Sequence, residues 1–249
     1  MQRFDGRRVL LTGAASGIGR ATSRRLVAEG ATVVGADRDA EGLEVTHRET
    51  DAPERFLPRL MDVADEDSIV AGVAAAVADL GGLDVLVNLA GIHVTTPLGT
   101  MDVTDVRRML EVNLIGTMLC CREAAPHLRD GSGVIINTAS SSATHGNPYM
   151  GGYAASKAGV LAFSLTLAAE LSGRRIRVVP ISPGGVTTPL SAGPSRDFEH
   201  LDTRYYARIM PYDGLAVPED IAGVIAFAAS DDGAYLTGSE LRVDGGAHT

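Results

Sequence analysis

The chain alternates short, β-branched apolar segments with longer segments of helical spacing along most of its length. The apolar segments lie at residues 8–12, 31–36, 55–61, 83–91, 133–140 and 176–182. Strands that read as continuously apolar are buried on both faces of their sheet, which is typical of parallel strands covered by helices. This alternation predicts an α/β fold built on a doubly wound parallel sheet.

We predict a single domain over residues 1–249, because no repeat, linker or shift in composition divides the chain. The regularity breaks once, over residues 188–216, where Pro, Gly, charged residues and aromatic residues are mixed. A connection of this length in a compact domain is usually a lid or a binding loop, and we expect it to bind substrate. A helix opened by Pro218 follows, and a last short strand is expected within residues 239–246.

Charge and cysteine usage exclude several classes of function. The formal net charge is -9, and no basic cluster with interleaved aromatic residues is present, which argues against nucleic acid as a partner. No segment has the length of a signal-sequence core or of a membrane span, so we expect a cytoplasmic protein without membrane contact. Cys120 and Cys121 are adjacent in an apolar helical stretch, where we expect reduced packing residues. A catalytic thiol is the alternative, but no histidine stands at a paired position.

A glycine-rich turn follows the first predicted strand, where TGAASGIG places Gly13, Gly17 and Gly19 ahead of an amphipathic segment. Glycines there let the chain turn tightly and bring bare backbone N–H groups against a pyrophosphate, at the positive end of a helix dipole. The spacing differs from the general G-x-G-x-x-G fingerprint, so the strand before it and the helix after it are needed for this interpretation. A purely structural turn is the alternative.

Asp37 directly follows the second apolar segment and stands eighteen residues after Gly19. An acid at this point can accept hydrogen bonds from an adenosine ribose, and it repels the extra phosphate of NADP. Arg38 follows directly and could cradle that phosphate. We therefore predict NAD as the cofactor and keep NADP as the alternative; a helix-capping role for Asp37 is the structural explanation to be weighed against both.

Tyr153 and Lys157 stand four residues apart in a segment of small and apolar residues. Positions i and i+4 of a helix share one face, so the phenol and the ammonium should point into the same space. A free phenol has a pKa of about 10, and a neighbouring cation favours the phenolate, which would make Tyr153 a usable proton acceptor. Ser140 follows the fifth apolar segment, and its hydroxyl can hold a substrate oxygen if that strand end meets the helix of Tyr153.

With these motifs the chain resembles the short-chain dehydrogenase/reductase family across essentially its whole length. Ser140, Tyr153 and Lys157 match the S-x12-Y-x3-K signature, and Asn113 matches the fourth catalytic position. The resemblance implies a three-layer Rossmann-type fold with about seven strands. It also implies cofactor contacts beyond Gly13, Gly17, Gly19 and Asp37, and these are Ser16, Ile18, Asp62, Val63, Asn88, Ala90, Gly91, Tyr153, Lys157, Pro183, Gly184, Val186 and Thr188.

The resemblance further implies a mechanism without a metal. Tyr153 would take the hydroxyl proton as hydride leaves for NAD, and Ser140 would orient the substrate oxygen. Lys157 would lower the pKa of Tyr153 and hold the nicotinamide ribose, while Asn113 would position a water that links Lys157 to solvent. The expected function is that of an NAD-dependent oxidoreductase that interconverts a secondary alcohol and a ketone. The alternatives are an NADP-dependent ketone or 3-oxoacyl reductase and a family member that binds NAD(H) without turnover.

Several expectations concern the surroundings of this site. The family usually has a second asparagine where this chain has Leu89, and the first, Asn88, is expected to brace neighbouring strands. His93, His145 and Met150 fall where pocket walls form in this family, but ordinary packing explains each equally well. The residues Tyr205, Tyr206, Met210 and Tyr212 favour a partly apolar substrate.

The segments around Lys157 and Cys120 are apolar nearly all round, which predicts a covering subunit and hence a homotetramer or homodimer.

Overall fold

The computed structural model describes residues 2–191, 201–202, 204–205 and 210–247. Its strands are β1 (Arg8–Thr12), β2 (Thr32–Asp37), β3 (Phe56–Leu60), β4 (Val85–Asn88), β5 (Val134–Thr138), β6 (Arg177–Pro183) and β7 (Leu241–Val243). Its α-helices are α1 (Gly17–Ala28), α2 (Ala40–Glu49), α3 (Glu66–Leu80), α4 (Val103–Met109), α5 (Gly116–Ala124), α6 (Gly151–Glu170) and α7 (Pro218–Ala229).

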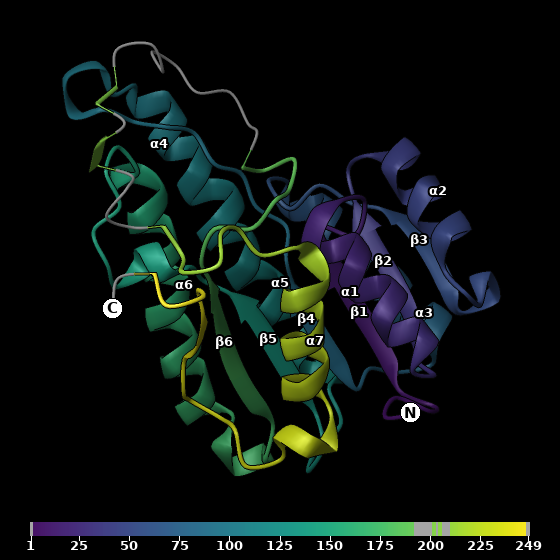
Figure 1. Ribbon diagram of the computed structural model, residues 1–249. Helices are drawn as coiled ribbons and strands as arrows, with labels where there is room; N and C mark the ends of the chain where they lie inside the picture. Colours follow the sequence, from purple (N-terminus) through teal and green to yellow (C-terminus); the bar gives the residue numbers. More distant parts are fainter. Residues whose placement is uncertain (1, 192–200, 203, 206–209, 248–249) are drawn as a thin grey trace.

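The seven strands found in the described residues form one parallel sheet in the order β3-β2-β1-β4-β5-β6-β7 (Figure 1). The predicted doubly wound sheet is therefore confirmed. The chain order reverses between β1 and β4, and ligands of such sheets bind in the crevice beyond the carboxyl ends of the strands at this point. The register aligns those ends, since Thr12 is level with Asn88 and Asn88 is level with Asn137.

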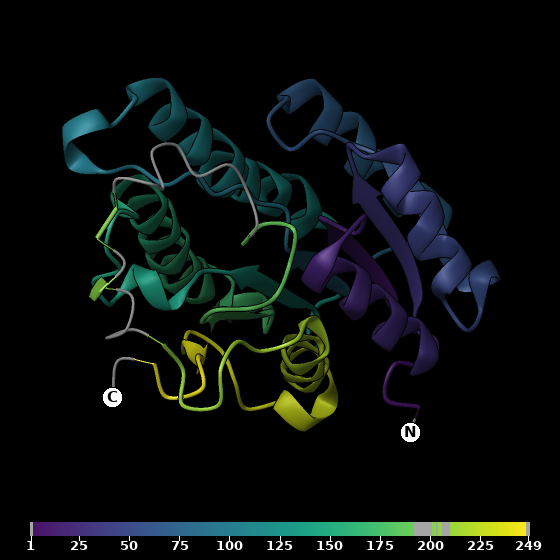
Figure 2. The same ribbon diagram turned by 45° about the horizontal axis from the view of Figure 1, so that its top comes forward.

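The core consists of two layers of side chains, one on each face of the sheet. Val9 and Leu11 of β1 pack with α1 and α7 on one face, whereas Leu10 packs with α3 and α5 on the other. This alternation along a strand with apolar residues throughout is what burial on both faces requires. Figure 2 shows the sheet between these layers, with α1 and α7 on one side and α5 on the other.

Two strands differ from their predicted form. The segment at residues 55–61 reads as buried on both faces, but β3 is the edge strand and Leu60 is 65% exposed. Pro58 suits that position, because an edge strand has one side without ladder partners. The segment at residues 83–91 is a strand only over Val85–Asn88, because its neighbour β1 ends at Thr12 and offers no further pairing.

The long helix predicted around Cys120 is interrupted. A π-helical turn over Leu110–Ile115 joins α4 to α5, and the buried Asn113 lies within it. Single π turns inside α-helices often occur at functional sites. No helix in the described ranges is long and apolar enough to span a membrane.

Candidate active site

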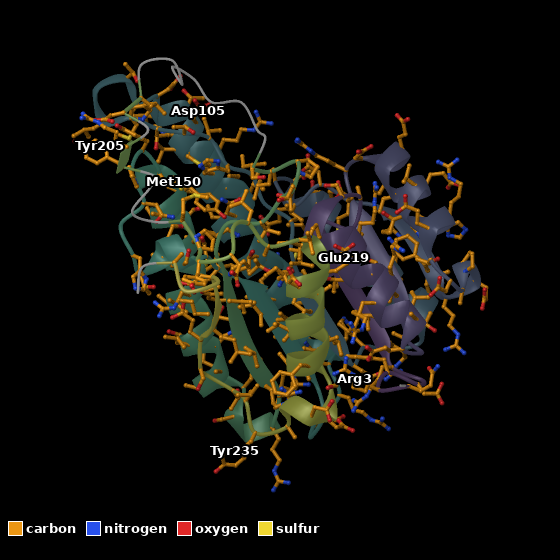
Figure 3. All side chains as sticks on the ribbon, in the orientation of Figure 1. Arg3, Asp105, Met150, Tyr205, Glu219 and Tyr235 are labelled. Atoms are coloured by element: carbon orange, nitrogen blue, oxygen red, sulfur yellow. The ribbon has the colours of Figure 1, made fainter. Side chains whose placement is uncertain are left out.

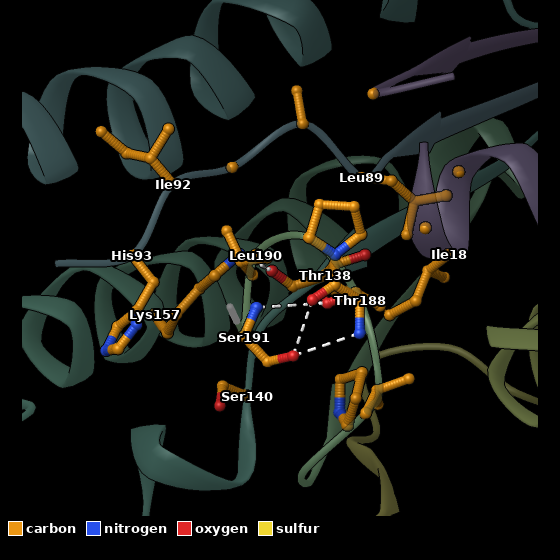
Figure 4. A pocket seen from close by; sticks show the side chains of 18 of the residues that line it. Ile18, Leu89, Ile92, His93, Thr138, Ser140, Lys157, Thr188, Leu190 and Ser191 are labelled. Atoms are coloured by element: carbon orange, nitrogen blue, oxygen red, sulfur yellow. Dashed lines mark hydrogen bonds between the residues drawn. The ribbon is translucent and has the colours of Figure 1, made fainter. Parts of the chain in front are cut away.

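A cleft of about 470 Å³ opens at the carboxyl ends of the strands. Its walls come from the turn after β1, the ends of β2 and β6, the segments after β4 and β5, and the first turns of α6 (Figure 4). A cleft of this size is ordinary for a small-molecule or cofactor site. All the predicted site residues line it except Asn88 and Asn113.

The glycine turn forms the floor of the cleft where α1 begins. Gly13 has a φ of 76°, and a Cβ there would lie 2.7 Å from the backbone nitrogen of Ala90. A Cβ on Gly19 would lie 1.8 Å from the carbonyl oxygen of Gly13, so no side chain fits between helix and turn. The closely packed backbone leaves the N-terminus of α1 facing the cleft, which is the arrangement that receives a pyrophosphate.

Asp37 lies in the cleft wall at the end of β2. Its Oδ2 accepts a hydrogen bond from the backbone N–H of Ala15 at 3.1 Å, and its Oδ1 accepts one from the N–H of Asp39 at 3.1 Å. Asp39, not Asp37, caps α2. The carboxylate of Asp37 is thus fixed at the cleft, and it retains lone pairs that can accept hydrogen bonds from a ribose. Because Asp37 does not cap α2, the helix-capping alternative does not account for its position.

Ser140 lies just beyond β5 and begins a short turn over Ser141–Ala143. Its Oγ accepts hydrogen bonds from the N–H of Ser142 at 3.2 Å and from the Ser142 hydroxyl at 2.9 Å. The hydroxyl of Ser140 is also near enough to the Tyr153 phenol to lower its pKa. Of the serines in this run, Ser140 therefore faces Tyr153, and Ser142 holds it in place.

Tyr153 and Lys157 lie on the same face of α6, as the spacing predicts. The Lys157 Nζ donates to the carbonyl oxygen of Thr138 at 2.7 Å, and it lies 5.9 Å from the centre of the Tyr153 ring. The lysine side chain is buried, with 4% of its surface exposed. The end of β5 and the first turns of α6 thereby bring a hydroxyl, a phenol and a cation to one end of the cleft.

The pKa values differ from the sequence-based expectation. Burial raises the pKa of Tyr153 to about 12, although the hydrogen bond from Ser140 acts in the opposite direction. Burial also lowers the pKa of Lys157 to about 8. We expected Lys157 to bring the phenol toward neutral pH, but in the protein alone the desolvation of Tyr153 outweighs a cation at this distance.

The two asparagines outside the cleft support its walls. The amide of Asn113 donates from Nδ2 to the Ile92 carbonyl at 3.0 Å and to Ser156 Oγ at 3.0 Å, and its Oδ1 accepts from the Ile92 N–H at 2.8 Å. Asn88 was grouped with the cofactor contacts, but its buried amide donates to Asn137 Oδ1 at 2.9 Å and braces β4 against β5.

Thr12 and Ser191, which the sequence did not single out, also support the cleft. Thr12 supports its floor, since its Oγ1 accepts from the N–H groups of Leu89 and Ala90 at 3.2 and 3.3 Å. The sequence signal for this supporting role was the position of the threonine at the end of a buried strand. Figure 4 shows hydrogen bonds between Thr188 and Ser191, which hold the start of the predicted substrate loop at the cleft.

Tyr205 and Tyr212, which were expected to favour a partly apolar substrate, lie outside the lining of the cleft. Tyr212 is 93% exposed and Tyr205 is 49% exposed, and neither lines the cleft, whereas Met210 does. Tyr206 lies outside the described residues. The apolar lining at this end comes instead from Leu190, Leu215 and Met150. Figure 3 places Met150 and Tyr205 at the same end of the molecule.

The thiols take no part in the cleft. Cys120 and Cys121 are each 1% exposed in α5. Burial raises the pKa of Cys120 to about 12, so it remains a thiol at neutral pH. This agrees with packing and not with nucleophilic chemistry.

Comparisons with known proteins agree with this geometry. Residues 13–248 match the family model described as enoyl-(acyl carrier protein) reductase. The chain is 38% identical over 247 residues to a 3-oxoacyl-[acyl-carrier-protein] reductase of Thermotoga maritima, which covers 98% of each chain. It is 40% identical over 247 residues to a cis-4-hydroxycyclohexanecarboxylate dehydrogenase of Sinomonas cyclohexanicum, again over 98% of each.

The comparison with solved structures also finds short-chain dehydrogenases. A short-chain dehydrogenase from Mycobacterium paratuberculosis bound to NAD has a TM-score of 0.90 at 30% identity and covers 98% of each chain. A short-chain dehydrogenase from Burkholderia cenocepacia in complex with NADP has a TM-score of 0.89 at 33% identity and covers 99% of this chain and 100% of its own. These similarities extend over the whole fold and do not distinguish between the two cofactors.

Proposed function

Because the chain belongs to the short-chain dehydrogenase/reductase family, we propose that it is an NAD-dependent oxidoreductase that interconverts a secondary alcohol and a ketone. The observation that carries the proposal is the meeting of Ser140, Tyr153 and Lys157 at one end of a dinucleotide-sized cleft. A hydroxyl that holds an oxygen, a phenol that exchanges its proton and a buried cation are together sufficient for acid–base chemistry at a carbinol.

Each of the three side chains has a defined part in the proton transfer. Ser140 accepts two hydrogen bonds from Ser142, so its own hydrogen is available for a substrate oxygen or the phenol. Tyr153 accepts the hydroxyl proton during oxidation and returns it during reduction. Lys157 is held in place by Thr138 and keeps a positive charge beside the phenol near neutral pH.

The cofactor supplies what the protein alone lacks. When bound, oxidised nicotinamide accepts the hydride and adds a positive charge at the catalytic end of the cleft. The pKa of Tyr153 is about 12 in the protein alone. That positive charge, added to the charge of Lys157, would lower the pKa of Tyr153, so that its phenol could exchange a proton with the substrate oxygen.

NAD is the proposed cofactor because Asp37 fixes a negative charge where β2 meets the cleft. A phosphate on the adenosine ribose would be repelled by that carboxylate. Arg38 also lines the cleft, which favours the NADP-dependent reductase as the second candidate. The resemblance to a 3-oxoacyl-[acyl-carrier-protein] reductase supports the same candidate.

We also propose that the protein acts as a homotetramer or homodimer. Ile115, Met118 and Leu165 are each at least 40% exposed on the outer surfaces around α5 and α6, and Tyr235 is fully exposed after α7. Such apolar residues on helices that already pack on the sheet favour a further covering layer. Sedimentation analysis of the purified protein tests this proposal, and a monomer at micromolar concentration would contradict it.

The proposed activity is tested by following NADH absorbance while the purified protein is mixed with NAD or NADP and a panel of alcohols. The panel includes steroid, polyol, cyclic and 3-hydroxyacyl alcohols, and Tyr153→Phe is the matched control because it removes only the hydroxyl. We expect reduction of NAD that is lost in the variant, while NADH binding measured by calorimetry is retained. Binding of NADH without turnover of any alcohol would instead support a non-catalytic member of the family.

A further inference from the structure

Three residues that line the cleft have a buried polar atom without a hydrogen-bond partner among the described residues: Thr138, at the end of β5, and His93 and Asn147, in the segments after β4 and β5. His93 and Asn147 both line the cleft. Within the described residues, no hydrogen-bond partner reaches the buried His93 Nε2 or the buried Asn147 Oδ1. A buried polar atom without a partner destabilises the folded state. Such atoms in one binding cleft point to a group of the substrate.

His93 lies next to the Tyr153 phenol, and Asn147 lies in the segment that leads into the helix of Tyr153. The His93 ring packs edge-on against the Tyr153 ring, with their centres 4.9 Å apart and an interplanar angle of 81°. Asn147 lies in the segment before α6, four residues ahead of Gly151, where that helix begins. Tyr153 is two residues into the helix. The two wall segments are tied together, because the N–H of Thr96 donates to the Tyr149 carbonyl at 2.7 Å.

The backbone under His93 is fixed by hydrogen bonds with Asn113. Asn113 holds both the N–H and the carbonyl of Ile92, the residue before His93. The last torsion of a histidine or asparagine side chain is broad and roughly two-fold. A half-turn about that bond would exchange a polar atom with a carbon or an amide partner at the same place, and the main chain would stay where it is. Figure 4 shows the His93 side chain among those that line the cleft.

The chemistry of the two groups limits the kind of substrate group that can bind to them. Burial lowers the pKa of His93, so its imidazole is neutral at physiological pH and does not attract a carboxylate by charge. A neutral imidazole nitrogen donates or accepts according to the tautomer, and an amide offers both a donor and an acceptor. A hydroxyl satisfies every one of these states, because it donates and accepts.

We propose that His93 and Asn147 form a polar subsite for a second hydroxyl of the substrate, on a carbon close to the one that is oxidised. The preferred substrates would then be vicinal diols and the corresponding α-hydroxy ketones, in preference to simple secondary alcohols. This inference rests on the proposed oxidoreductase function and adds the substrate class to it. A site that hydrogen-bonds a substrate hydroxyl discriminates strongly against the analogue without it, because its own polar groups are then left unpaired.

The test compares kcat/KM for matched pairs of substrates: 1,2-cyclohexanediol with cyclohexanol, and 2,3-butanediol with 2-butanol. We expect the wild-type protein to prefer each diol by about tenfold or more, which is the scale of one neutral hydrogen bond. His93→Phe keeps the aromatic contact with Tyr153 and should abolish most of that preference, and Asn147→Leu should reduce it. His93→Gln restores a polar atom near the Nε2 position and should recover part of it.

His145→Phe is the matched control, since His145 lies outside the cleft lining and its ring contacts Arg242. It should leave the ratio of diol to monoalcohol unchanged. A wild-type ratio near one, or a His93→Phe variant that slows both members of a pair equally, would overturn the subsite while leaving the oxidoreductase proposal intact. If no alcohol of either kind is oxidised while NADH still binds, the proposed function fails first and the subsite fails with it.

Discussion

Replacing Lys157 with methionine should make the protein's stability respond to pH in a calculable way. Burial lowers the pKa of Lys157 from 10.5 to about 8. One pKa unit corresponds to about 1.36 kcal/mol, so the buried ammonium destabilises the folded protein by about 3 kcal/mol near pH 7. Methionine removes this cost, but it leaves the Thr138 carbonyl unpaired, which costs about 1–3 kcal/mol. The net effect at pH 7 is expected to lie between neutrality and a gain of about 2 kcal/mol.

The direction in which the stability changes with pH is the most direct test of this prediction. Between about pH 8 and about pH 10.5 the unfolded chain still binds the Lys157 proton, whereas the folded protein has released it. Wild-type stability therefore rises with pH in this window through Lys157, and the methionine variant lacks that rise. By about pH 10 the destabilisation by the ammonium should have fallen to about 1 kcal/mol, so the variant loses roughly 2 kcal/mol relative to wild type.

Urea unfolding followed by far-ultraviolet circular dichroism is the suitable assay, because the chain contains no tryptophan. Both proteins are compared at about pH 7 and about pH 10 and at one protein concentration, since assembly would make stability depend on concentration. Tyr153→Phe serves as the control, because the raised pKa of Tyr153 keeps the phenol protonated over this range. A stability difference between wild type and Lys157→Met that is the same at both pH values would refute the reasoning.

Three further outcomes are expected. Asp37→Ala should raise the ratio of kcat/KM for NADP over NAD by at least about tenfold, because the repelling carboxylate is gone; an unchanged ratio would contradict the proposed cofactor preference. Ser142→Ala removes the hydroxyl that donates to Ser140 Oγ and keeps the backbone N–H that also donates to it. It should lower kcat more than it changes KM, which steady-state kinetics would measure; an effect on KM alone would argue against this positioning role. Asn88→Ala should destabilise the protein by about 1–3 kcal/mol in urea unfolding without changing the Kd for NADH, and a large loss of NADH binding would restore Asn88 to the cofactor contacts.

The fold and the central site residues could be predicted from local sequence patterns, namely the hydrophobicity of the strands and the spacing of residues along a helix. Strands with apolar residues on both faces indicated a parallel sheet, and the spacing of Tyr153 and Lys157 placed them on one helical face. Ser140 was distinguished from its neighbours by its distance along the chain from Tyr153, and its contact with the phenol agrees.

What the sequence left open depends on how distant segments meet. The raised pKa of Tyr153 comes from burial by other elements, and no spacing within α6 encodes it. The exposed position of Tyr212 likewise depends on how its loop lies over the cleft, so its aromatic character alone misled the prediction. His93 could not be separated from a packing residue until its ring was seen against Tyr153 with an unpartnered nitrogen.

The packing of α7 on α1 has a consequence for how the chain is made. The apolar face of α1 is covered by Ile221 and Ile225 of α7, roughly two hundred residues later. During synthesis that face emerges early and stays exposed until almost the whole chain has left the ribosome. A partial chain that ends before α7 should aggregate or occupy a chaperone, although it already contains the glycine turn and all four residues predicted to be catalytic.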